Sequence, residues 1–328
     1  MTEPIVVERL LDTNTEETFA LLTEPERLRR WLAVSASVDL RVGGDYRILC
    51  VPGHAAVGQV IEIDPGKRVV YSWGWHGDTE VPPGSTTLIV ELEPEGEQTR
   101  VRFTHEGLVG VWAERHLAGW NQHLDRLVAA AAKGDAGLEP WLIDPEDKNH
   151  LTVAEATWAI CRQQLLTLGP DDADRPTPCA DFNAHELVVH LRNSMVTIGS
   201  AAGAVFDDGS ETSTAEDYVA GAVESALTAW RERGLDGEVP FGDGTAPAFL
   251  PAGILSLEFL VHAWDIAQVK GVELDVPEAI AAYVLDIATS IIADDNRGPG
   301  KGFGQELDAP GDDPMSRLIA FTGRKAPA

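Results

Sequence analysis

The chain has 328 residues, of which 44% are hydrophobic, and a formal net charge of −28 at pH 7. This length exceeds what one hydrophobic core usually organises, so we predict two domains, and the hydrophobic content excludes a disordered chain. Residues 1–133 carry 13 basic and 20 acidic side chains, whereas residues 134–328 carry 12 and 33. A surface this acidic repels phosphates and anionic lipid headgroups. We therefore expect no nucleic acid and no membrane among the partners of the protein, and favour a small molecule.

The amino terminus lacks the basic and apolar pattern of a secretory signal, and the sequence has no uninterrupted apolar run of about 18 residues that would span a membrane. The cysteines, Cys50, Cys161 and Cys179, are too scattered for a disulfide framework or a zinc ribbon. We interpret them as reduced thiols and expect a cytoplasmic protein.

The first half is dominated by alternation of apolar and polar residues with a period of two. Segments such as 68–73 and 86–92 are bounded by glycine, proline and acidic residues, which is typical of antiparallel strands. Helical spacing occurs at 16–31, with a break at Pro25, and over 112–132, which predicts a long amphipathic helix. We therefore predict an α+β domain over residues 1–133, with an antiparallel sheet around a long C-terminal helix.

Three segments of this half carry a family resemblance: 20–25 (ALLTEP) leading to 30–32 (RWL), 39–44 (DLRVGG), and 119–120 (GW) before 124–127 (LDRL). They are similar to the START-like (SRPBCC) helix-grip domains of the type named after the activator of the heat-shock-protein ATPase, over about residues 5–133. The resemblance implies an apolar cavity between sheet and long helix. Its candidate lining residues are Trp73, Trp75, Trp112 and Trp120, although each could equally be packed in an ordinary core.

The histidines of this half do not form a predicted metal site. His54, His76, His105, His116 and His123 include no pair at the i,i+4 spacing that a helical site requires. We expect a binding module, and we expect no chaperone partner because no basic docking face accompanies the family name.

In the second half the period becomes helical. Residues 134–150 lose all periodicity and read as a linker, and helices are predicted near 152–168, 184–203, 214–235, 251–269 and 277–294. We predict an all-α bundle of four or five helices over residues 151–328.

The predicted helix near 251–269 carries ionisable residues in apolar surroundings. Glu258, His262 and Asp265 are spaced i, i+4 and i+7, so they project from one face, and burying them without partners would cost several kcal/mol. A divalent metal ion would compensate them, and His190 in an apolar stretch of another helix could complete the site. The spacing equally allows a helix salt bridge or a hydrogen-bonded core histidine, and leaves two other candidate ligands, Cys179 and Glu186.

Residues 175–183 (RPTPCADFN), the pair 190–191 (HL), 262–265 (HAWD) and 316–324 (SRLIAFTGR) resemble the DinB-like metal-binding domains and mycothiol-dependent maleylpyruvate isomerases, over about 152–324. The resemblance implies zinc bound by His190, Glu258 and His262, with Asp265 orienting His262 or the thiol. The sequence departs from the family at 182–185, where FNAH replaces a more usual WTVR, and it has no separate carboxy-terminal domain like that of the isomerase.

Three protein ligands leave one zinc position open, where a bound thiol would lose its proton and become a nucleophile near neutral pH. The resemblance implies mycothiol or a related low-molecular-weight thiol as cosubstrate. We therefore predict a zinc-dependent thiol transferase or isomerase for an apolar or electrophilic small molecule, with a fused hydrophobic-ligand-binding domain. The alternative is a non-catalytic small-molecule-binding or stress-response protein with a structural metal.

Overall fold

A computed structural model describes residues 3–179, 181–207, 214–298 and 301–325. The chain folds into two compact units, Met1–Gly137 and Leu138–Ala328. The division falls inside the segment 134–150 that we predicted as a linker. Residues 138–150 count with the second unit, where Pro140–Ile143 forms the short helix α4 and packs against the helix that follows it.

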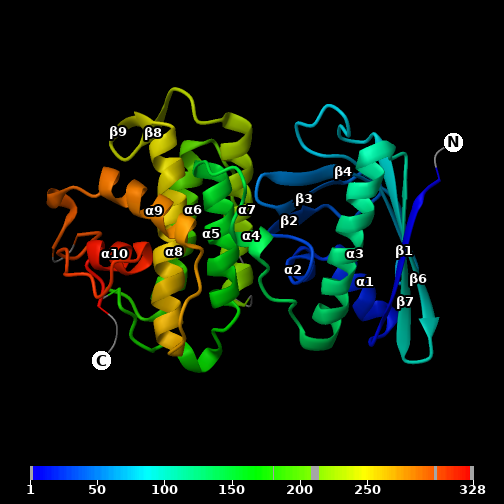
Figure 1. Ribbon diagram of the computed structural model, residues 1–328, viewed down its shortest axis with the longest axis horizontal. Helices are drawn as coiled ribbons and strands as arrows, with labels where there is room; N and C mark the ends of the chain where they lie inside the picture. Colours follow the sequence, from blue (N-terminus) through cyan, green and yellow to red (C-terminus); the bar gives the residue numbers. More distant parts are fainter. Residues whose placement is uncertain (1–2, 180, 208–213, 299–300, 326–328) are drawn as a thin grey trace. The chain divides into compact units, whose positions relative to one another are not determined.

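The first unit contains a seven-stranded antiparallel sheet with one long helix, α3, across one of its faces (Figure 1). The strands follow the order β1-β7-β6-β5-β4-β3-β2, so every neighbouring pair except β1 and β7 is consecutive in sequence. This confirms the predicted α+β class. The elements are β1 (Ile5–Leu11), α1 (Thr15–Thr23), α2 (Pro25–Leu28), β2 (Ser35–Val38), β3 (Asp45–Val51), β4 (His54–Asp64), β5 (Arg68–Trp73), β6 (Thr86–Glu95), β7 (Gln98–Glu106) and α3 (Gly110–Lys133).

The register of the sheet follows from the alternation in its strands. Val69 pairs with Val90 and Tyr71 pairs with Leu88, and all four side chains are buried in the core. A slip of one residue would turn these side chains away from the core, so the apolar pattern fixes the pairing. The same face of the sheet receives the buried stripe of α3, which includes Trp120, Leu124 and Leu127.

The second unit is mainly helical, and each of the five predicted helices is present to within three residues at either end. Its elements are α4, α5 (His150–Leu165), η1 (Pro170–Asp172), α6 (Ala184–Ala201), α7 (Ala215–Arg233), β8 (Glu238–Phe241), β9 (Gly244–Pro247), α8 (Phe249–Lys270), α9 (Glu278–Ile291), η2 (Asp294–Asn296) and α10 (Pro314–Phe321).

In the second unit the hairpin of β8 and β9 and the helices α4 and α10 were not predicted. Gly242 and Asp243 form a two-residue turn between Phe241 and Gly244, and Gly242 has a φ of 58°, which favours glycine. We had interpreted this glycine-rich segment only as a break between helices. The expectation of a purely α-helical unit is therefore wrong at this point.

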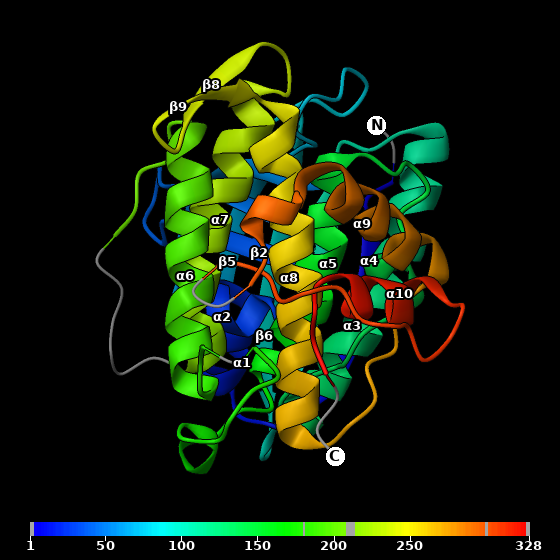
Figure 2. The same cartoon turned by 90° about the vertical axis from the view of Figure 1, so that its left-hand side faces the viewer.

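Helix α8 is the centre of the second unit and packs against α5, α6 and α9 (Figure 2). It is long and apolar enough to cross a membrane by length and composition, contrary to our expectation that no such segment exists. However, 72% of its apolar window is buried inside the protein, which is typical of a central core helix and does not indicate a membrane protein.

A buried ion pair joins α5 to α7. Glu155 is 1% exposed, and its carboxylate accepts hydrogen bonds from Nε and Nη2 of Arg231. We expect Arg231→Met to lower the stability of the second unit by about 3 kcal/mol, because the glutamate loses a cationic partner in the interior. Differential scanning calorimetry should then show a fall of about 6–12 °C in the transition of this unit. The double variant Glu155→Gln, Arg231→Met should recover part of the lost stability. An unchanged transition temperature in Arg231→Met would contradict a stabilising role for this ion pair.

Candidate metal centre and ligand cavity

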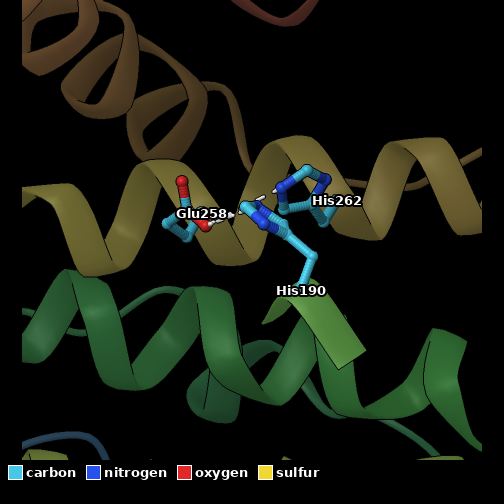
Figure 3. A group of neighbouring side chains, drawn as sticks. All are labelled: His190, Glu258 and His262. Carbon is cyan, nitrogen blue, oxygen red and sulfur yellow. Dashed lines mark ion pairs between the residues drawn. The ribbon is translucent and has the colours of Figure 1, made fainter. Parts of the chain in front are cut away.

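The residues predicted as metal ligands come together in the second unit (Figure 3). His190 extends from α6, and Glu258 and His262 extend from α8, with one potential ligand atom of each within 4.8 Å of the others. Oε2 of Glu258 lies 3.4 Å from Nε2 of His190 and 3.7 Å from Nε2 of His262. The side chain of His190 is 33% exposed and that of His262 only 4%, so the group is approached from the His190 side.

Local sequence sets the position of His190. Asn183 caps the start of α6 by accepting a hydrogen bond from the backbone N–H of Glu186, while the Glu186 carboxylate accepts one from the backbone N–H of Asn183. This capping box fixes where the helix begins, and hence which residues face α8. Phe182, just before the cap, stacks on the imidazole of His190 with ring centroids 4.7 Å apart.

Asp265 fixes the orientation of His262, and Arg324 in turn binds Asp265. Asp265 is fully buried and accepts a hydrogen bond from Nδ1 of His262 at 2.9 Å, and Nε of Arg324 lies 3.0 Å from both of its carboxylate oxygens. Because Nδ1 of His262 donates to Asp265, Nε2 is the ring nitrogen that faces Glu258. We had predicted Asp265 but missed Arg324, since no spacing rule connects residues 59 positions apart.

The electrostatics of the group favour a cation. Burial would raise the pKa of Glu258, but the imidazoles of His190 and His262 outweigh it and lower this pKa to about 2. Its Oε2 is nevertheless buried and has no hydrogen-bond partner in the described part of the chain. An ionised oxygen buried between two imidazoles requires a positive charge beside it, which either a protonated imidazole or a bound cation supplies. Two imidazole nitrogens and one carboxylate oxygen are a donor set that suits zinc.

The two alternative ligands lie outside this group. Glu186 is occupied by its capping role. Cys179 is half-buried and does not join the cluster found among the described residues. Burial raises the pKa of the Cys179 thiol to about 11.

The first unit contains a cavity of about 270 Å³ beside α3. Its lining includes all four tryptophans that we named as candidates. The lining residues are Leu32, Cys50, Val51, His54, Trp73, Trp75, Asp78, Trp112, Arg115, His116, Gly119, Trp120 and His123.

Two histidines accept hydrogen bonds from two of the four indole groups of this aromatic wall, those of Trp75 and Trp120. Nε1 of Trp75 donates to Nε2 of His116 at 3.1 Å, and Nε1 of Trp120 donates to Nδ1 of His105 at 3.0 Å. An indole N–H can only donate, so each imidazole must accept and is therefore neutral. Nδ1 of His116 donates in turn to the carbonyl of Trp112 at 2.8 Å. Burial lowers both pKa values, that of His105 to about 3. Sequence reasoning had assigned these histidines no role.

Residues 12–132 match the family model described as "Activator of Hsp90 ATPase homolog 1-like protein". The first unit is a domain of this type. The match confirms the helix-grip resemblance of the first half; it begins directly after β1 and includes α3 up to its penultimate residue.

Similar proteins include the uncharacterized proteins Rv0738 and MT0763 of Mycobacterium tuberculosis strains H37Rv and CDC 1551. Each is 27% identical over 163 residues, which cover 49% of this chain and 89% of the relative. Among solved structures, a protein of Chromobacterium violaceum, CV1439, is 26% identical over 40% of this chain and 98% of its own, with a TM-score of 0.35. The Aha1 dimer of Colwellia psychrerythraea is 24% identical over 40% and 98%, with a TM-score of 0.36.

The neutral histidines of the activator-homologue domain predict a pH dependence. An unfolded histidine takes up a proton as the pH falls through about 6.5, whereas folded His105 does so only near 3, so folding stability is lost as the pH falls between these values. His105 alone contributes a slope of up to about 1.4 kcal/mol per pH unit. We therefore measure the free energy of unfolding of His105→Gln with urea between pH 4 and 6.5. We expect the slope of this free energy against pH to be smaller than in the wild type by about this amount. A slope equal to that of the wild type would contradict the neutral assignment.

The metal assignment predicts the zinc content of variants. The purified wild type should bind one equivalent of zinc, and His190→Ala and His262→Ala should lose it because each removes one of three ligands. Inductively coupled plasma mass spectrometry after dialysis against zinc measures this content. His185→Ala, an exposed histidine on the same helix as His190, is the matched control and should retain the metal. Full zinc content in His262→Ala would contradict the site.

Proposed function

We propose that the second unit is a zinc-dependent enzyme that activates a low-molecular-weight thiol for transfer to an electrophile or for cis–trans isomerisation. One observation carries this proposal: the ionised Oε2 of Glu258 lies between two imidazoles without a hydrogen-bond partner in the described part of the chain. A divalent cation held by these three side chains satisfies all of them.

When bound, zinc would lower the pKa of a thiol in its open position, so that the thiolate forms near neutral pH. The chain itself supplies geometry. Asp265 and Arg324 keep His262 in one tautomer and orientation, and the Phe182 ring does the same for His190 by stacking. The partly exposed edge of His190 is where thiol and electrophile would enter.

The resemblance of residues 152–324 to DinB-like domains and mycothiol-dependent maleylpyruvate isomerases supports this choice of chemistry. It favours mycothiol or a related thiol as cosubstrate and a cytoplasmic location, where such thiols are kept reduced. The departure at residues 182–185 means that the electrophile need not be maleylpyruvate.

The activator-homologue domain would hold an apolar small molecule in its cavity. Its four tryptophans offer a large aromatic surface, and its buried imidazoles are engaged with indole groups. Because these imidazoles cannot exchange protons without breaking those hydrogen bonds, the cavity suits binding rather than acid–base catalysis. We propose no chaperone partner for this domain.

A second candidate function is a non-catalytic binding or stress-response protein with a structural metal. The low exposure of Glu258 (16%) and His262 (4%) favours it, because structural zinc sites are usually closed to solvent. A fourth ligand from the protein would support this alternative, and an exogenous thiol at the metal would exclude it.

Asp265→Asn separates metal binding from activity. The asparagine retains the shape but not the charge that orients His262, so we expect most of the zinc to remain at saturating metal while the rate of thiol addition falls by about 10–100-fold. The assay follows, by absorbance, the substitution of the chloride of 1-chloro-2,4-dinitrobenzene by mycothiol, which forms the thioether and releases chloride. Asp286→Asn, an exposed aspartate on α9, is the control. Equal rates for the zinc-loaded and zinc-free wild type would contradict the enzymatic function.

A further inference from the structure

A serine hydroxyl lies beside the ligand atoms of the metal centre. Ser194 follows His190 by one helical turn on α6, and its Oγ is 3.5 Å from Nε2 of His190. That nitrogen is the atom that faces Glu258.

Several hydroxyls within helices of the unit donate to the backbone of the preceding turn, whereas that of Thr228 donates to the Glu224 carboxylate. Thr157 on α5 donates to the carbonyl of Val153 at 2.8 Å, and Ser256 on α8 donates to the carbonyl of Gly253 at 2.9 Å. Such bonds to the preceding turn are the usual way in which a helix accommodates a hydroxyl. Ser194, in contrast, directs its Oγ toward His190, at a distance too long for a strong hydrogen bond.

A hydroxyl can donate one hydrogen bond and also accept. A metal-bound imidazole nitrogen has no lone pair left to accept the hydroxyl proton, and a carboxylate that coordinates a cation is a weaker acceptor than a free one. The proton can therefore pass to a stronger acceptor at the metal. A thiolate or a water-derived hydroxide in the open position is such an acceptor, and hydrogen bonds to charged groups are the stronger ones.

We propose that Ser194 is a positioning residue that donates a hydrogen bond to the exogenous anionic ligand, a thiolate, in the open position of the metal centre. This inference rests on the proposed function. It places thiol selection on α6, next to the exposed edge of His190, and it makes the hydroxyl a determinant of thiol affinity and not of metal affinity.

Cobalt(II) and 2-mercaptoethanol test this inference without an activity assay. The full-length protein is freed of metal with a chelator, loaded with cobalt, and titrated with the thiol while the thiolate-to-cobalt charge-transfer band is recorded. Ser194→Ala should bind cobalt within about threefold of the wild type but bind the thiol about tenfold more weakly. Ser194→Thr, which restores a hydroxyl, should regain most of the affinity. Ser200→Ala, an exposed serine on the same helix, is the control.

The outcomes distinguish a failure of the Ser194 inference from a failure of the proposed function. Equal thiol affinity in Ser194→Ala and the wild type would overturn the role of Ser194 and leave the proposed function intact. A loss of cobalt affinity by more than about tenfold in Ser194→Ala would make the hydroxyl a metal ligand, which also overturns the positioning role. A wild type that binds cobalt but gives no charge-transfer band with thiol would overturn the proposed function together with this inference.

Discussion

The second unit depends on how charge is compensated along one buried helix, α8. Glu258, His262 and Asp265 occupy one face of a helix that is otherwise apolar and mostly enclosed by other helices. Arg324 neutralises Asp265, and Asp265 engages Nδ1 of His262, so compensation is complete at that end. At the other end the Glu258 carboxylate lies beside two imidazoles. Because an isolated ionised carboxylate is costly in an interior, this imbalance is the basis on which we propose a metal centre.

The two units treat their buried imidazoles in opposite ways. In the activator-homologue domain, His105 and His116 each accept from an indole N–H, and every partner of these rings is a group of the same domain. In the second unit, Nε2 of His262 and Nε2 of His190 face the Glu258 carboxylate, which can accept a hydrogen bond but cannot donate one. A hydrogen-bond network in which every group has a partner rigidifies a core, whereas a network with an unsatisfied group can be completed by a ligand. This difference supports our proposal of ligand binding for the first unit and metal chemistry for the second.

The sequence predicts much of this arrangement, and its limits have physical causes. The spacing on α8 identifies a common face for Glu258, His262 and Asp265, because helical periodicity is a local property. The partners across the site are non-local: His190 was inferred from its apolar surroundings, and Arg324 was missed because nothing in the spacing connects it to Asp265. The hairpin of β8 and β9 was missed because its strands are too short to show alternation, so Gly242 read as a helix break. The roles of His105 and His116 required the tertiary positions of the tryptophans.

The most direct test of the central claim is X-ray absorption spectroscopy at the zinc edge, on the zinc-loaded protein before and after addition of mycothiol. Our account predicts two imidazole ligands and otherwise only oxygen ligands before addition, then one sulfur at about 2.3 Å afterwards. A spectrum with a sulfur ligand already present would indicate a cysteine in the site and contradict the ligand set. A spectrum without sulfur after addition would contradict thiol activation at the metal.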